Sequence, residues 1–113
     1  MSHQTPEIHI ERLDGAADAD AQVVDVREVS EYVDGHVPGA RLVPMGHLTS
    51  RLGELDRSRP VYIVCASGNR SAAMADLLVA HGYEAYSVAG GTTAWERSGR
   101  PLETADAVRK DTP

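Results

Sequence analysis

Short apolar runs and segments of helical periodicity alternate along the chain. Residues 23–26 and 61–64 are almost continuously β-branched or apolar, a pattern typical of strands that are buried on both faces. Briefer apolar runs over 8–10, 41–43 and 83–88 predict further strands, the first of them at a sheet edge. The doubly buried runs indicate a central sheet that is covered on both sides.

Helical patterns lie between these runs. Residues 28–34 place apolar side chains at i, i+3 and i+4 before Gly35, and leucines repeat on one face of 46–55, so both segments predict short helices. The segment 69–81 is apolar nearly all round and is therefore expected to be a largely buried helix. A Thr-x-x-Glu spacing that begins at Thr93 has the form of a capping box and predicts the start of a last short helix.

Strands that alternate with helices predict an α/β domain with an open parallel sheet and helices on both faces. We expect one domain over 1–113, with its core over about 8–102, a frayed start over 1–7 and a polar tail over 103–113. In such sheets ligands bind at the carboxyl ends of the strands. The residues that follow strand 61–64 are therefore the first candidates for a functional site.

Composition and charge narrow the classes of function. Seventeen acidic and eleven basic residues give a formal charge of −6, and the absence of a basic run argues against nucleic acid as a partner. No stretch approaches the ~18 apolar residues of a membrane span. Because the start is polar, without an apolar signal region, we expect a cytoplasmic protein with no membrane partner. The single cysteine excludes an internal disulfide and a cysteine-rich metal site.

That cysteine stands where chemistry is expected. Cys65 follows strand 61–64, and a loop of small residues then leads into the first turn of helix 69–81. Successive N–H groups of such a loop can converge on one centre, and the helix N-terminus adds positive potential. Together with Arg70, these groups should lower the pKa of Cys65 and make it a nucleophilic thiolate. The candidate site is the segment Cys65, Ala66, Ser67, Gly68, Asn69, Arg70 and Ser71.

Several motifs, in this order, resemble those of single-domain rhodaneses, a family of sulfurtransferases. They are Val-Val-Asp-Val-Arg-Glu at 23–28, Gly-His-Val-Pro-Gly-Ala at 35–40, the cysteine loop at 65–70, and Gly90-Gly91 followed by Trp95. The resemblance covers about 23–102. It implies a three-layer α/β/α rhodanese-like fold, whose five-stranded parallel sheet carries the cysteine loop after the fourth strand.

The resemblance also implies a reaction. Cys65 would attack the outer sulfur of a donor such as thiosulfate, release sulfite and hold the sulfur as a persulfide, which a thiol or cyanide acceptor then removes. The partners would be a small-molecule donor and a thiol acceptor, or a sulfur-carrier protein, and no metal or organic cofactor would be needed. The N–H groups from Ala66 to Ser71 would stabilise thiolate and persulfide, and Arg70 would bind the anionic donor. Gly68 would let the backbone bend without blocking the pocket.

Three polar residues outside the loop are interpreted as structural support. Asp25 and Arg27 follow a buried strand, where a charged group usually pairs with a neighbour. The candidate partners are each other's loops, Arg41 or His36. His36 is expected to hydrogen-bond locally within a turn, because a preformed thiolate needs no base.

Two other classes of function remain open. A non-catalytic rhodanese module would bind a partner protein, although such a module needs neither Cys65 nor Arg70. A phosphatase or arsenate reductase of related fold would use Cys-x5-Arg, whereas this chain has Cys-x4-Arg and no second cysteine. One departure from the family concerns the sulfur donor: Ala66 stands where many thiosulfate-active members have a basic residue. Arg70 is therefore the only basic side chain between 65 and 71.

Overall fold

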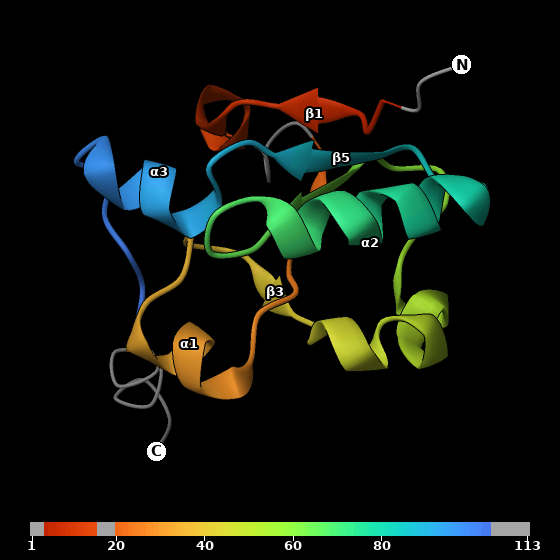
Figure 1. Ribbon diagram of the computed structural model, residues 1–113, viewed down its shortest axis with the longest axis horizontal. Helices are drawn as coiled ribbons and strands as arrows, with labels where there is room; N and C mark the ends of the chain where they lie inside the picture. Colours follow the sequence, from red (N-terminus) through yellow and green to blue (C-terminus); the bar gives the residue numbers. More distant parts are fainter. Residues whose placement is uncertain (1–3, 16–19, 105–113) are drawn as a thin grey trace.

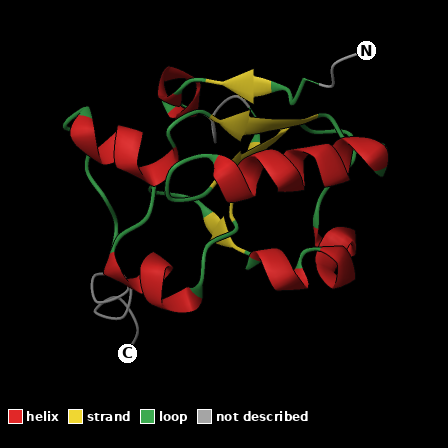
Figure 2. Cartoon of the chain, viewed as in Figure 1, coloured by secondary structure: helices red, strands yellow, loops and turns green. Residues whose placement is uncertain are grey.

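The computed structural model describes residues 4–15 and 20–104. Its strands form a five-stranded sheet in the order β1-β5-β4-β2-β3, and every neighbouring pair is parallel. The strands are β1 (Glu7–Ile8), β2 (Gln22–Asp25), β3 (Arg41–Leu42), β4 (Val61–Val64) and β5 (Ala85–Val88). The predicted α/β class and five-stranded parallel sheet are confirmed (Figures 1 and 2).

Helical segments connect the strands and cover the sheet. The α-helices are α1 (Val29–Asp34), α2 (Asn69–Ala80) and α3 (Gly91–Arg97). Shorter 3₁₀ turns are η1 (Ile10–Leu13), η2 (Met45–His47) and η3 (Thr49–Glu54). In the part of the chain that the structure describes, no helix has the length and apolar character that crossing a membrane requires.

The two faces of the sheet carry separate apolar clusters, as the alternation of side chains along β4 shows. Val61 and Ile63 belong to a cluster with Leu78 of α2, and Val64 belongs to a second cluster with Trp95 of α3. Because successive strand residues point to opposite faces, α2 and α3 cover opposite sides. The three-layer α/β/α arrangement is therefore present.

The prediction of one helix over 46–55 is wrong. Two 3₁₀ segments occupy this stretch, and the second is kinked at Arg51, whose φ of −115° and ψ of 16° are not helical. Thr49 and Gly53 within this stretch are poor helix formers, so the apolar pattern alone does not stabilise a regular α-helix here. Leu48 is nevertheless fully buried, so the leucine pattern correctly indicated packing.

The expectations for the last two helices also need correction. Only Ser71, Ala75 and Leu78 of α2 are buried, because a single face of the helix packs on the sheet. The larger apolar side chains outside this face are partly buried, as for Met74 and Leu77, or exposed, as for Val79. Helix α3 begins at Gly91, so Thr93 lies inside the helix and does not cap it. The strand expected over 83–88 begins only at Ala85.

Strand register brings distant segments to one edge of the sheet. Asp25 is paired in register with Val64 on one side and with Leu42 on the other, so β2, β3 and β4 end at the same level. The loop that begins at Cys65 therefore lies at the same edge as the segment that follows Asp25. The start of the expected polar tail is also tied down, since Glu103 forms an antiparallel bridge with His36. Glu7 belongs to β1, so the expected frayed start does not extend to it. Residues 1–3 of that start and 105–113 of the expected polar tail lie outside the described residues.

Candidate active site

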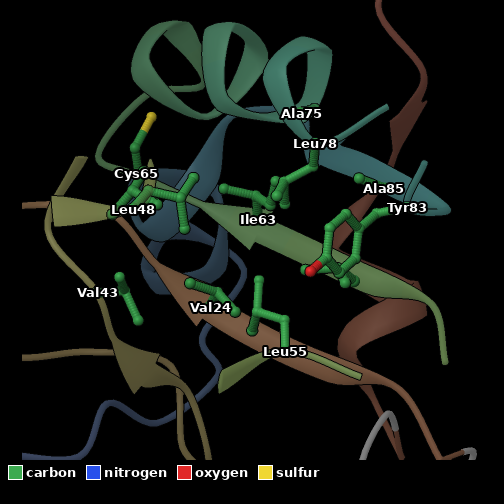
Figure 3. Packing of buried hydrophobic residues seen from close by; sticks show 12 residues of the cluster. Val24, Val43, Leu48, Leu55, Ile63, Cys65, Ala75, Leu78, Tyr83 and Ala85 are labelled. Atoms are coloured by element: carbon green, nitrogen blue, oxygen red, sulfur yellow. The ribbon is translucent and has the colours of Figure 1, made fainter. Parts of the chain in front are cut away.

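Cys65 directly follows the central strand β4 and is almost inaccessible, with 1% of its surface exposed. It packs at the border of the first apolar cluster, and its sulfur points away from the labelled apolar side chains (Figure 3). The chain then turns through Gly68, whose φ of +111° favours glycine, and enters α2 at Asn69. A buried strand is thus followed directly by the cysteine, and a short loop then leads into a helix N-terminus.

Backbone and hydroxyl groups surround the sulfur. The N–H groups of Gly68 and Ser71 donate hydrogen bonds to Cys65 Sγ over 3.1 and 3.3 Å. The hydroxyl of Ser71 lies 3.4 Å from Sγ, where it can accept from the thiol or donate to the thiolate. Burial raises the pKa of the Cys65 thiol, but the hydrogen bonds from Ser71, Gly68 and Ser67 outweigh it, and the pKa lies below its ordinary value. The loop favours a thiolate.

A second serine extends this contact into the core. The hydroxyl of Ser87, on β5, is fully buried and lies 2.7 Å from the hydroxyl of Ser71, which also lies 3.2 Å from the carbonyl of Gly68. The sequence analysis missed Ser87. One feature of the sequence could have identified it: Ser87 carries a hydroxyl within a run of mainly apolar residues that forms a buried strand.

Arg70 is held by a residue that the sequence analysis also missed. Its two terminal nitrogens donate to the two carboxylate oxygens of Glu31, on α1, over 2.7 and 2.9 Å. Hydrogen bonding to Arg70 is the main cause that lowers the pKa of Glu31 to about 2, and the same contact raises the pKa of Arg70. Glu31 follows the end of β2, at the same edge of the sheet as the loop, and this placement is the signal that could have identified it.

Asp25 and Arg27 pair with each other. The carboxylate of Asp25 accepts from the Arg27 backbone N–H over 3.0 Å and from the guanidinium over 2.9–3.1 Å. Arg27 also donates to the carbonyl of Gly35 over 2.7 Å. Both side chains are buried, while Arg41, the alternative partner, pairs with Glu54 at the opposite edge. The expectation that each charge is neutralised by a neighbour is met by this contact.

His36 takes part in the turn after α1. Its ring stacks on Tyr32 at a centroid distance of 3.6 Å, and Nδ1 lies 2.8 Å from the Tyr32 carbonyl oxygen. Nε2 lies 3.2 Å from a carboxylate oxygen of Glu103. These local contacts match the expected turn role, and within the described ranges 4–15 and 20–104 no three His, Cys, Asp or Glu side chains gather as metal ligands would.

The start of α3 supports the cysteine loop from behind. The N–H groups of Thr92 and Thr93 donate to the carbonyls of Cys65 and Ala66 over 2.8 and 3.0 Å. A Cβ placed on Gly91 would lie 2.2 Å from the Cys65 carbonyl oxygen, so no side chain fits there. Gly91 therefore allows α3 to approach the loop closely, as Figure 1 shows.

Comparisons with known proteins agree with this architecture. The model of the rhodanese-like domain matches residues 6–98. The chain is 36% identical over 78 residues to the thiosulfate sulfurtransferase GlpE of Pseudoalteromonas translucida, covering 68% of this chain and 74% of that protein. It is 40% identical over 76 residues to the uncharacterized protein YqhL of Bacillus subtilis, covering 66% of this chain. The chain spans less than two thirds of some curated relatives, 60% of YqhL and 44% of YrkF from the same organism.

Solved structures give the same result. A rhodanese-like domain protein from Staphylococcus aureus superposes with a TM-score of 0.77 and 36% identity, over 88% of this chain and 97% of that one. Fold, family model and relatives thus agree, and this chain belongs to the rhodanese-like family.

Proposed function

We propose that this domain is a sulfurtransferase that carries sulfane sulfur as a persulfide on Cys65. The observation that supports this most directly is the environment of the sulfur, which accepts hydrogen bonds from the N–H groups of Gly68 and Ser71 at the carboxyl end of β4. These donors stabilise negative charge on Sγ, and in a persulfide the same ring of loop N–H groups faces the terminal sulfur.

In the first half-reaction, the Cys65 thiolate attacks the outer sulfur of a donor such as thiosulfate. An S–S bond forms on Cys65, the S–S bond of the donor breaks, and sulfite leaves with its electron pair. In the second, an acceptor thiolate or cyanide attacks the terminal sulfur, and the Cys65 thiolate leaves. The cycle is ping-pong and needs no further reactant. The acceptor is a small thiol or a sulfur-carrier protein, and the site of action is the cytoplasm.

The loop also bears on the phosphatase alternative. Cys65 and Arg70 close a six-residue loop in which two N–H groups already contact the sulfur at 3.1 and 3.3 Å. A phosphatase loop has to admit a tetrahedral phosphate in front of the thiolate, and its additional residue provides that room. The tighter loop supports transfer of a single sulfur atom.

Intact-mass measurement after brief incubation with thiosulfate tests the proposal, with Cys65→Ser as the matched control. We expect the wild-type protein alone to gain one sulfur atom and to lose it on addition of cyanide or a thiol. A parallel incubation with polysulfide separates the choice of donor from the mechanism. Absence of labelling with both donors would contradict persulfide chemistry and favour the partner-binding module.

A further inference from the structure

We propose that Glu31 determines which sulfur donors reach Cys65, by neutralising Arg70 and so selecting against the doubly charged thiosulfate in favour of donors with less negative charge. The inference rests on the proposed sulfur transfer and names the donor class of the same site. Glu31 acts through charge and does not touch the reacting atoms in the free protein.

The Glu31–Arg70 pair has a fixed geometry. Each carboxylate oxygen of Glu31 meets a different guanidinium nitrogen of Arg70, at 2.7 and 2.9 Å. One of these oxygens also accepts the backbone N–H of Glu28 over 3.0 Å, as part of the capping box of α1. The carboxylate of Glu31 is thus held by its own helix, through the N–H of Glu28, and by the guanidinium of Arg70. Such bidentate pairs are geometrically specific.

The charges of the pair are partly accessible to solvent, unlike the sulfur. About a third of each side chain is exposed, 33% for Glu31 and 32% for Arg70, whereas Cys65 is 1% exposed. The charge of the Cys65 thiolate contributes to the raised pKa of Arg70, so the guanidinium lies within electrostatic reach of the sulfur. A donor that approaches the sulfur therefore meets the combined charge of Arg70 and Glu31.

That combined charge is close to zero. Arg70 is the only basic side chain between 65 and 71. The nearby Arg27 is buried and satisfied by Asp25 and the carbonyl of Gly35, so its charge is also compensated. The charges within each of the two ion pairs, Arg70–Glu31 and Arg27–Asp25, thus cancel. The attraction that remains for an anion comes from backbone N–H dipoles.

The consequence depends on the charge of the donor. A potential that changes the encounter of a monoanion by a given factor changes that of a dianion by about the square of the factor, because the energy is proportional to charge. Thiosulfate carries two negative charges and an alkyl thiosulfonate carries one, although both offer a sulfane sulfur on a sulfonyl group. Removal of the Glu31 charge should therefore help thiosulfate more than the thiosulfonate.

Glu31→Gln is the decisive variant, because glutamine keeps the shape, and its single amide oxygen can still accept from one nitrogen of Arg70 and from the N–H of Glu28. Glu54→Gln is the matched control. Glu54 accepts from Arg51 in the same two-point manner, over 2.7 and 2.8 Å, and it also pairs with Arg41 at the opposite edge of the sheet. Both variants change the net charge equally, so any difference between them reflects the position of the charge that was removed.

The first readout does not require sulfur transfer. The single cysteine is alkylated with iodoacetate, an anion, and with iodoacetamide, which is neutral, and the ratio of the two rates is compared among proteins. We expect Glu31→Gln to raise the iodoacetate-to-iodoacetamide ratio by about threefold to tenfold at low salt, an effect that shrinks at high salt. Arg70→Ala should lower the ratio, and Glu54→Gln should leave it unchanged. A ratio in Glu31→Gln that is unchanged or lower would overturn the proposal and leave Glu31 as a residue that only positions Arg70.

The second readout measures the rate of sulfur loading from thiosulfate and from methanethiosulfonate. Glu31→Gln should increase the rate with thiosulfate by a larger factor than the rate with methanethiosulfonate, and equal factors would contradict the inference. If no protein loads sulfur from either donor or from polysulfide, the proposed function fails. The alkylation ratio then still decides whether Glu31 selects by charge.

Discussion

The hydroxyl oxygens of Ser71 and Ser87 lie 2.7 Å apart, in the first turn of α2 and within β5. Each hydroxyl has one proton to donate. When Ser87 donates to Ser71, the proton of Ser71 is free to point at the Gly68 carbonyl or at the Cys65 thiolate. The buried strand β5 can thus influence the protonation of Cys65 through one intermediate hydroxyl.

Removal of the nearer hydroxyl should raise the pKa of Cys65. In Ser71→Ala the backbone N–H bond to Sγ remains, but the hydroxyl that stabilises the thiolate is lost, so we expect a rise of about one unit. The pH dependence of iodoacetamide alkylation measures this pKa, and its midpoint should move to higher pH, with less thiolate at pH 7. Ser67→Ala is the control, because Ser67 acts on the sulfur through its N–H. If the midpoint does not move in Ser71→Ala, the Ser71 hydroxyl does not stabilise the thiolate.

Ser87→Ala should act on both stability and protonation. It leaves the Ser71 hydroxyl without its buried partner, which should reduce the free energy of unfolding by about 1–2 kcal/mol. The alkylation midpoint of Cys65 should rise by less than in Ser71→Ala, because the direct contact with the sulfur is retained. Urea denaturation and the same alkylation series test the two effects. A loss of stability with no change of midpoint would show that Ser87 serves packing alone.

The buried pair of Asp25 and Arg27 should be important for folding. Asp25→Asn leaves the guanidinium of Arg27 buried beside a neutral amide, and removal of one partner from such a pair typically costs about 3–5 kcal/mol. Urea denaturation should therefore show a much lower midpoint than for the wild-type protein. Glu54→Gln, which removes the acidic partner of the ion pairs with Arg41 and Arg51 at the surface, should leave the midpoint nearly unchanged. A small effect of Asp25→Asn would show that solvent or another acceptor satisfies Arg27.

Gly91→Ala should impair the active loop. The added Cβ would lie 2.2 Å from the carbonyl oxygen of Cys65 and 2.9 Å from backbone atoms of Ala66, so the loop or α3 has to move. Sulfur loading should fall by on the order of tenfold or more, because catalytic geometry tolerates little displacement. Gly99→Ala is the control, since Gly99 also has a positive φ, +86°, but has open space around it. It should lose only about 1–2 kcal/mol of stability, with wild-type loading.

The chain order of the strands and the position of Cys65 directly after the central strand could be predicted from the sequence because they depend on local patterns. β-Branched runs specify buried strands, and the small residues after Cys65 specify a turn into a helix. The partners of these residues depend on tertiary contacts: Glu31 is 39 positions from Arg70, and Ser87 is 16 from Ser71. The leucine pattern over 46–55 likewise reported burial correctly but not the backbone geometry, which Gly53 and the kink at Arg51 alter.

The support of the cysteine loop by Thr92 and Thr93 has a consequence during synthesis. These residues leave the ribosome well after Cys65. The sheet cannot be completed before β5 has emerged, because β1 pairs with β5, and the support behind the loop requires α3, which ends at Arg97. A nascent chain that ends before α3 carries its cysteine without that support. The support of the cysteine loop is thus completed late in translation, when α3 packs behind it.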